Sequence, residues 1–205
     1  MPINHRHALS LIATSASLST TAVADIVYTD LNPDMVLFTS LAGEQFLIAE
    51  FDINTDGVID LSIQVQSGEG DASTAAVVML NGAEGIHDTP GASMRPFNAG
   101  DLIADPLDDT KFWTTSGSLD WKTVDTWPDD GAYLGFRMPV AGGFQYGWMS
   151  VACTIPDIDS ATVTVFGFAY ETDVDTGIAA GMVPAPGSLC VLALGALVCP
   201  RTRRG

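Results

Sequence analysis

An alternation of polar and apolar side chains over residues 58–66 limits the possible folds of this chain more than any other feature. Ile59, Leu61, Ile63 and Val65 occupy every second position, and the positions between them are mostly polar. A repeat of two is the period of a β-strand that buries one face, whereas an amphipathic helix repeats every 3.6 residues. The segment is therefore predicted to be a half-buried strand.

Short apolar or alternating runs recur between residues 26 and 171, separated by Gly, Pro, Asn and Asp. No stretch shows the helical period over an ordinary helix length, so we expect an all-β fold. Antiparallel strands with turn signals at this spacing favour a two-sheet sandwich with jelly-roll-like connections. Residues 82–128 are predicted to form long loops, with one or two short strands around residues 112–115. The other predicted strands are residues 26–29, 35–39, 44–51, 58–66, 75–81, 132–138, 144–155 and 161–171.

The first 24 residues are typical of a secretory signal peptide. Arg6, between two histidines, precedes an uncharged, weakly apolar stretch at residues 8–21. Ala22 and Ala24 then form an A-x-A cleavage site. An amphipathic first helix of the domain is the alternative, but the apolar positions follow no 3.6-residue period. We therefore expect a short signal helix that signal peptidase removes after Ala24.

The C-terminus combines a proline-containing segment, an apolar run and a cluster of arginines, in that order. The apolar run, residues 189–199, is about half as long as the roughly 20 residues that a membrane-spanning helix needs. The positive-inside rule places the arginines on the cytoplasmic side. A hydrophobic sorting helix that anchors the chain transiently is therefore expected, because a buried C-terminal helix would not require three arginines after it. The residues of this predicted signal are Pro184, Ala185, Pro186, Arg201, Arg203 and Arg204.

This arrangement resembles the PEP-CTERM sorting signal of exported bacterial proteins, in a variant with Ala185 where the family has glutamate. The resemblance implies that an exosortase-type enzyme processes the chain at the cell envelope. Residues 133–137, 146–151 and 168–171 are similar to the "YLGFRF", "YGWVRL" and "AYET" segments of surface proteins with such tails. These similarities imply a family of exported β proteins and no particular reaction. The predicted divisions are a signal peptide (1–24), an acidic β-sandwich domain (25–181) and a sorting tail (182–205).

The predicted domain is strongly acidic. All 25 acidic residues fall within residues 25–181, together with only four of the 8 basic residues, which gives this segment a net charge of −21 against −17 for the whole chain. Such a surface repels nucleic acid phosphates and anionic membranes, so neither is an expected partner. Cys153 is the only cysteine of the segment and lies in an apolar run, so we expect a buried thiol and no internal disulfide.

Residues 52–60 read D-x-N-x-D-G-x-x-D, with oxygen donors at alternate positions. A short loop of this kind can wrap a Ca²⁺ ion, and Gly57 allows the sharp turn after the third donor. Ile63 stands where an EF-hand loop has its bidentate Glu, so the segment resembles instead the calcium loops of dockerin and FG-GAP type repeats and would cap a β-hairpin. An ordinary Asp-Gly hairpin turn is the alternative. The predicted ligands are the side chains of Asp52, Asn54, Asp56 and Asp60 and the backbone carbonyl of Val58.

No residue pattern indicates a catalytic site. The chain lacks the G-x-S-x-G signature of serine hydrolases, and some glycosidase-like pair can always be imagined among 25 carboxylates. Tryptophans in the loop-rich middle could stack on sugar rings, with loop anchoring as the alternative, and Trp148 is expected in the core. The candidate stacking residues are Trp113, Trp121 and Trp127.

We therefore expect a protein of the cell surface or extracellular matrix that is exported, sorted at the envelope, stabilised by calcium and without catalytic activity. Its expected partners are signal peptidase, the exosortase-type enzyme and extracellular polysaccharide. A carbohydrate-binding module is the first alternative, and a glycoside hydrolase is a more distant one.

Overall fold

The computed structural model describes most of the residues between 25 and 184. The predicted signal helix and sorting helix lie outside the described residues, and with them Ala22, Ala24, Ala185, Pro186, Arg201, Arg203 and Arg204. The described residues are 25–43, 46–67, 73–87, 93–105, 107, 111–121, 127–157 and 159–184.

Every regular element in the described residues is a β-strand, which confirms the predicted all-β class. All pairings between the named strands are antiparallel. The strands are β1 (Ile26–Ser40), β2 (Phe46–Phe51), β3 (Leu61–Gln66), β4 (Thr74–Met79), β5 (Glu84–His87), β6 (Pro96–Phe97), β7 (Leu102–Ile103), β8 (Phe112–Thr114), β9 (Ser116–Trp121), β10 (Ala132–Val140), β11 (Gly143–Asp157), β12 (Ser160–Glu171) and β13 (Ile178–Ala179).

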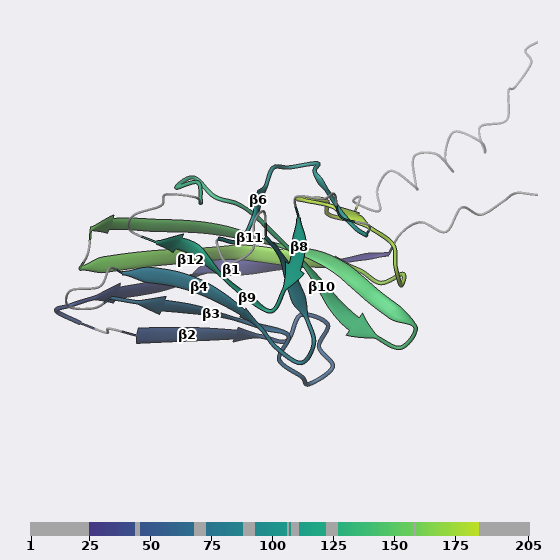
Figure 1. Cartoon of the computed structure of the whole chain (residues 1–205), viewed down its shortest axis with the longest axis horizontal. Helices are drawn as coiled ribbons and strands as arrows, with labels where there is room; N and C mark the ends of the chain where they lie inside the picture. The colour runs from purple at the N-terminus through teal and green to yellow at the C-terminus, as the bar shows by residue number, and fades with distance from the viewer. Residues whose placement is uncertain are drawn as a thin grey trace, which may run out of the picture.

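The strands form two large sheets and one small one. The seven-stranded sheet has the order β1-β12-β11-β10-β5-β8, with β6 also paired to β10, and the four-stranded sheet has the order β2-β3-β4-β9. β13 and β7 form a separate pair. Figure 1 shows β2, β3 and β4 running along the long axis of the molecule beside β11 and β12. This arrangement agrees with the predicted antiparallel two-sheet sandwich.

The main hydrophobic core lies between the two large sheets. Leu61, Ile63 and Val65 of β3 are completely buried, as their alternation predicts. Phe51 of β2 meets Phe168 of β12 edge-on, with ring centroids 6.2 Å apart. Removing apolar surface from water contributes roughly 25 cal/mol per Å², so this shared core is what holds the layers together.

β1 is one strand of 15 residues where the sequence predicts two. Its pairing with β12 runs from Ile26 to Asp30 and resumes at Met35 after a register shift. Pro33 lies in this interval and has no backbone N–H to donate, which accounts for the local break. The two predicted strands are therefore the two halves of β1.

Residues 82–128 contain more strand than the sequence predicts. The predicted short strand around residues 112–115 is present as β8, but β5, β6, β7 and β9 also fall in this range. β9 pairs along β4, and its sequence, SGSLDW, is poor in the β-branched residues that favour strands. β9 is a strand because it pairs with β4, which is distant in sequence, and not because its own residues favour strands. The prediction of long loops over residues 82–128 is therefore wrong.

A second, smaller core covers the outer face of the seven-stranded sheet. Tyr146 and Trp148 of β11 point to this side, whereas Met149 and Val151 belong to the main core. Ile178 of β13 is buried with the two aromatic residues. Trp148 is thus buried as predicted, and β13 packs against the body of the sheet.

Candidate functional site

The predicted calcium segment forms the turn between β2 and β3. These two strands pair antiparallel along their whole length, so residues 52–60 cap a hairpin as expected. Thr55 and Gly57 both have positive φ angles, 60° and 88°, and glycine enters this left-handed region at no steric cost. The segment is consequently a tightly wound loop, and β3 begins at Leu61, later than predicted.

Three predicted ligands turn their side-chain oxygens onto backbone N–H groups of the same loop. Asp52 Oδ1 and Asn54 Oδ1 both accept from the N–H of Asp56, each at 3.1 Å. Asp52 Oδ2 accepts from the N–H of Gly57 at 2.8 Å, and Asp56 Oδ1 accepts from that of Val58 at 2.8 Å. Asp52 and Asn54 therefore converge on one point, and the same bonds would hold an ordinary turn.

Asp60, the last predicted ligand, is buried and closes the base of the loop. Its Oδ2 accepts from the N–H of Ile53 at 2.8 Å. Burial raises the pKa of this carboxyl, the hydrogen bond from Ile53 opposes the rise, and the charges of Asp56 and Asp52 add to it. Among the described residues, no group of three or more His, Cys, Asp or Glu side chains is arranged to hold a metal ion.

The three candidate stacking tryptophans differ in their surroundings. Trp127 is 1% exposed, and its Nε1–H donates to the carbonyl oxygen of Val151 at 2.9 Å, so it anchors the segment before β10 and offers no ring face to a ligand. Trp113 is partly buried and belongs to the cluster described next. The side chain of Trp121 lies outside the described part of the chain.

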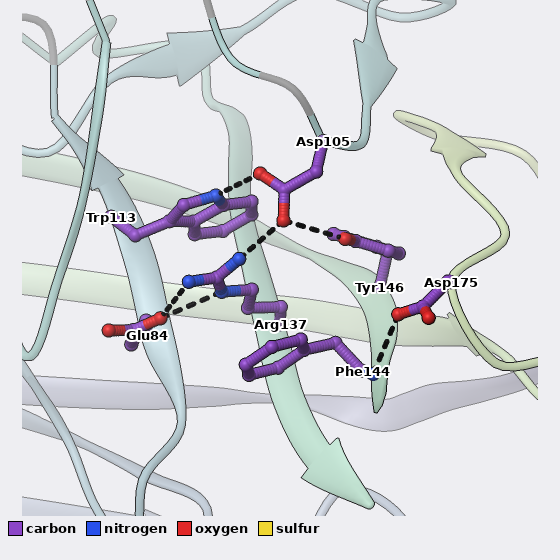
Figure 2. Close-up of polar contacts among 7 residues, drawn as sticks. All are labelled: Glu84, Asp105, Trp113, Arg137, Phe144, Tyr146 and Asp175. Carbon is purple, nitrogen blue, oxygen red and sulfur yellow. Dashed lines mark hydrogen bonds and ion pairs between the residues drawn. The ribbon is translucent and has the colours of Figure 1, made fainter. Parts of the chain in front are cut away.

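A cluster of charged and aromatic side chains surrounds Arg137 on the outer face of the seven-stranded sheet (Figure 2). The guanidinium lies between the rings of Trp113 and Phe144, 4.4 Å and 4.0 Å from their centroids. Its Nε donates to Glu84 Oε2 at 2.7 Å, and Nη2 contacts the same oxygen. Its Nη1 donates to Oδ2 of Asp105 at 2.5 Å. One cation thus joins four strands and the loop after β7.

Asp105 is a second centre of this Arg137 cluster. Its Oδ1 accepts from Trp113 Nε1 at 2.6 Å, and its Oδ2 accepts from the Tyr146 hydroxyl at 2.9 Å. Burial raises the pKa of Tyr146, and the hydrogen bond to the Asp105 carboxylate raises it further because it favours the protonated phenol. Both oxygens of Asp105 are engaged by the protein itself, which indicates a structural junction and not an open binding site.

The sequence-based predictions do not include the Arg137 cluster. The sheet register places Arg137 and Tyr146 directly opposite each other. The sequence does contain one sign of this cluster, because Arg137 is the one charged residue of β10 and a charge within an apolar strand needs a partner. Its acidic partners Asp105 and Glu84, however, lie 32 and 53 positions away, so no local pattern reveals them.

Residues 172–183, here called the C-terminal strap, are tied to the same outer face. The Nε1–H of Trp148 donates to the carbonyl oxygen of Met182 at 3.2 Å. Ala180 makes two backbone hydrogen bonds to the turn before β7, both 2.9 Å long. Pro184, the first residue of the predicted sorting signal, follows the strap and is exposed. The described chain therefore ends next to a segment that is held against the domain.

A pocket of about 340 Å³ opens beside β4 and β9. Val77, Ser116 and Ser118 line it, together with the buried His87. A Cβ on Gly117 would lie 2.0 Å from His87 Nε2, so only glycine leaves room for the imidazole. Besides this imidazole, the lining contains hydroxyl and apolar groups but no carboxylate, so the pocket lacks the acid pair of a glycosidase.

The described part of the chain is thus an acidic, antiparallel two-layer β protein. Its Arg137 cluster links strands and loops of the same chain to one another. No helix in that part is both long and apolar enough to cross a membrane. No protein-family model, curated protein or solved structure matches the chain.

Proposed function

We propose that the protein is an exported, non-catalytic component of the cell surface or extracellular matrix. The observation that carries this proposal is the distribution of charge: signal-like segments at residues 1–24 and 182–205 contain no acidic residue, and the segment between them contains all 25. The Arg137 cluster supports a structural role, because its charged groups bind one another. A net charge of this size also favours a soluble, hydrated surface.

Export is tested by changing the cleavage site in the native host. Signal peptidase requires small residues at this site, so Ala22→Leu/Ala24→Leu should accumulate an uncut precursor, whereas the wild-type chain should begin at Asp25. Ala16→Leu, inside the apolar stretch, is the matched control and should be cut normally. A wild-type chain that keeps its first 24 residues in the cytosol would contradict the proposal.

Envelope sorting is tested at the arginine cluster. Replacing Arg201, Arg203 and Arg204 by glutamine removes the charges that should hold the tail on the cytoplasmic side, so the variant should escape processing and retention. Thr202→Gln keeps all three arginines and should behave as wild type. Unchanged processing of the triple variant would exclude this signal.

We further propose that Ca²⁺ binds the 52–60 loop. Asp52 and Asn54 support this proposal because their oxygens already converge on one N–H group. Asp56 and the carbonyl of Val58 would complete the set, and Asp60 would have to exchange its bond to Ile53 for the ion. The ion would also offset part of the domain's negative charge.

Thermal melting of the full chain with calcium and with excess chelator tests this site. A ligand that binds only the folded state adds about 2.7 kcal/mol when it is present at a hundred times its Kd. Asp52→Asn/Asp56→Asn should abolish the difference, whereas Asp129→Asn, an exposed change on another turn, should preserve it. Identical wild-type curves, with no metal in elemental analysis, would leave the segment as an Asp-Gly hairpin turn.

Carbohydrate binding is the alternative function, and it has less support. Trp127 is buried and Trp113 is held in the Arg137 cluster, so Trp121 is the one candidate ring left for stacking. A glycan array with wild type and Trp121→Ala separates the two functions. Saturable binding that the substitution abolishes would replace the structural role by a lectin-like one.

The jelly-roll-like character of the sandwich is also a proposal. The pairing of β1 with β12 supports it, because this pairing joins the first and last long strands in one sheet. The consecutive hairpins β2-β3-β4 and β10-β11-β12 differ from the alternation between sheets that a jelly roll shows. The proposed likeness to a jelly roll therefore rests on the pairing of β1 with β12 alone.

A further inference from the structure

β1 is an edge strand among the described strands, and its second half has no charge, proline or bulge of its own to protect it. Among the described strands, β12 pairs with one side of β1 and none pairs with the other. Charges, prolines and bulges normally prevent edge strands from pairing with other chains. The first half of β1 has Asp30, Pro33 and Asp34 together with a register shift, but residues 35–43 contain no charged residue and no proline.

Two large apolar side chains are exposed on this unprotected half. Val36 is 57% exposed and Phe38 is 53% exposed. Their cross-strand neighbours on β12 are Thr164 and Thr162, so neither side chain has a charged cross-strand neighbour. The carboxylates of Asp157 and Asp159 lie further along, at the turn beside Ser40 and Leu41. In a domain with a net charge of −21, carboxylates elsewhere would repel a second copy of the chain, whereas Val36 and Phe38 offer an uncharged contact.

The other sheet ends on the same side of the molecule. β2 is the edge strand of the four-stranded sheet, and it packs next to β1. Its Phe46 and Ile48 are also exposed. Both layers of the sandwich therefore present an apolar edge side by side.

We propose that two copies of the chain join along this side, through antiparallel pairing of β1 with its counterpart. The inference goes beyond the proposed function and does not depend on export. A two-fold axis perpendicular to the seven-stranded sheet would extend that sheet into the second copy and keep the outer faces of both copies on the same side. Two residues that stand directly opposite each other across the interface must then both point to the outer face or both to the inner face. Successive residues of a strand alternate between the two faces, so the axis must pass beside one residue of β1, which then stands opposite itself, and not between two residues.

An axis at Leu37 gives the most favourable register. It sets Val36 of each copy opposite Phe38 of the other, so two apolar cross-strand pairs form on the outer face. Asp34 then faces Ser40, so no like charges stand opposite each other. The edge is thus complementary to itself, which is the property that a two-fold interface requires.

Sedimentation velocity of the full chain, in mild detergent to keep the apolar tail apart, tests the interface. We expect a reversible dimer that tightens as salt screens the net charge. Val36→Asp/Phe38→Asp places like charges opposite each other twice and should raise the dimer Kd at least about tenfold. Val36→Asp/Phe38→Lys places opposite charges across the axis and should stay within about threefold of wild type. Both variants lose the same apolar side chains, so a fold defect caused by that loss would appear in both, and a melting curve of each variant shows whether it is folded.

Leu102→Asp is the matched control, because this side chain is 68% exposed on β7, which pairs with β13 in a separate sheet and not with β1. It should leave the dimer unchanged. A wild-type chain that stays monomeric at high salt, or an association that both double variants leave intact, would overturn the inference. Binding of a neutral polysaccharide by a monomer, lost in Val36→Asp/Phe38→Asp, would assign the face to that ligand and also overturn it.

Discussion

Replacing Arg137 by methionine should lower the free energy of unfolding by about 3 kcal/mol. The arginine side chain is 14% exposed, and its partners Glu84 and Asp105 are 27% and 39% exposed. A hydrogen bond to a charged group contributes about 1.5–3 kcal/mol when it is desolvated. Water screens the more exposed pair between Arg137 and Asp105, so we assign that pair a contribution of about 1.5 kcal/mol or less. Methionine still fills the space between the two rings, so the loss is one of charge and not of volume.

Urea unfolding of the full chain, followed by tryptophan fluorescence, measures this loss. A change of this size corresponds to a Tm lower by about 6–12 °C. Arg137→Lys keeps the charge but not the planar fork and should fall in between. Arg137→Met/Glu84→Gln should cost less than the sum of its single changes, because it removes one of the two carboxylates that would otherwise face a missing cation. If Arg137→Met stays within about 0.5 kcal/mol of wild type, the cluster does not stabilise the fold and the reasoning fails.

Three further outcomes concern buried aromatic side chains, one in the main core and two in the second. Trp127→Phe leaves the carbonyl of Val151 without its donor and should cost about 1–3 kcal/mol in urea unfolding; an unchanged midpoint would show that the bond does not matter. Trp148→Phe removes the bond to Met182 and should expose the C-terminal strap to protease about fivefold more often, with cleavage rates elsewhere unchanged. The pKa of Tyr146 is raised above 10.0 by burial and by Asp105, so the stability it contributes is fully present below pH 10 and is lost as pH rises through the raised value. Absorbance titration should show a phenolate that forms above pH 10 and is absent in Tyr146→Phe; its appearance at pH 10 or below would contradict the geometry.

The parts of the fold that sequence could predict are those that depend on local pattern. The alternation of Ile63 and Val65 with polar neighbours marks a strand because one face of β3 is buried whatever its partner. The hairpin at residues 52–60 follows from Gly57, which accepts a left-handed backbone, and from Asp52 and Asp56, whose oxygens accept from N–H groups of the loop. These features require no knowledge of distant contacts.

The parts that sequence missed depend on pairing between distant segments. β9 contains Gly117 and two serines and becomes a strand only because β4 supplies its hydrogen bonds. The Arg137 cluster requires the register that brings Glu84 and Asp105 to one arginine. Asp60 appeared equivalent to the other carboxylates of its loop, but the fold directs it inward to Ile53. Each of these outcomes is set by tertiary contacts that a one-dimensional pattern does not contain.

Mass spectrometry of the intact protein, isolated from its native host by cell fraction, tests the proposed export and sorting most directly. We expect a polypeptide in the envelope or medium that begins at Asp25 and has lost the apolar run and the arginines after it. A chain of all 205 residues in the cytosolic fraction, with both ends retained, would contradict the proposed function.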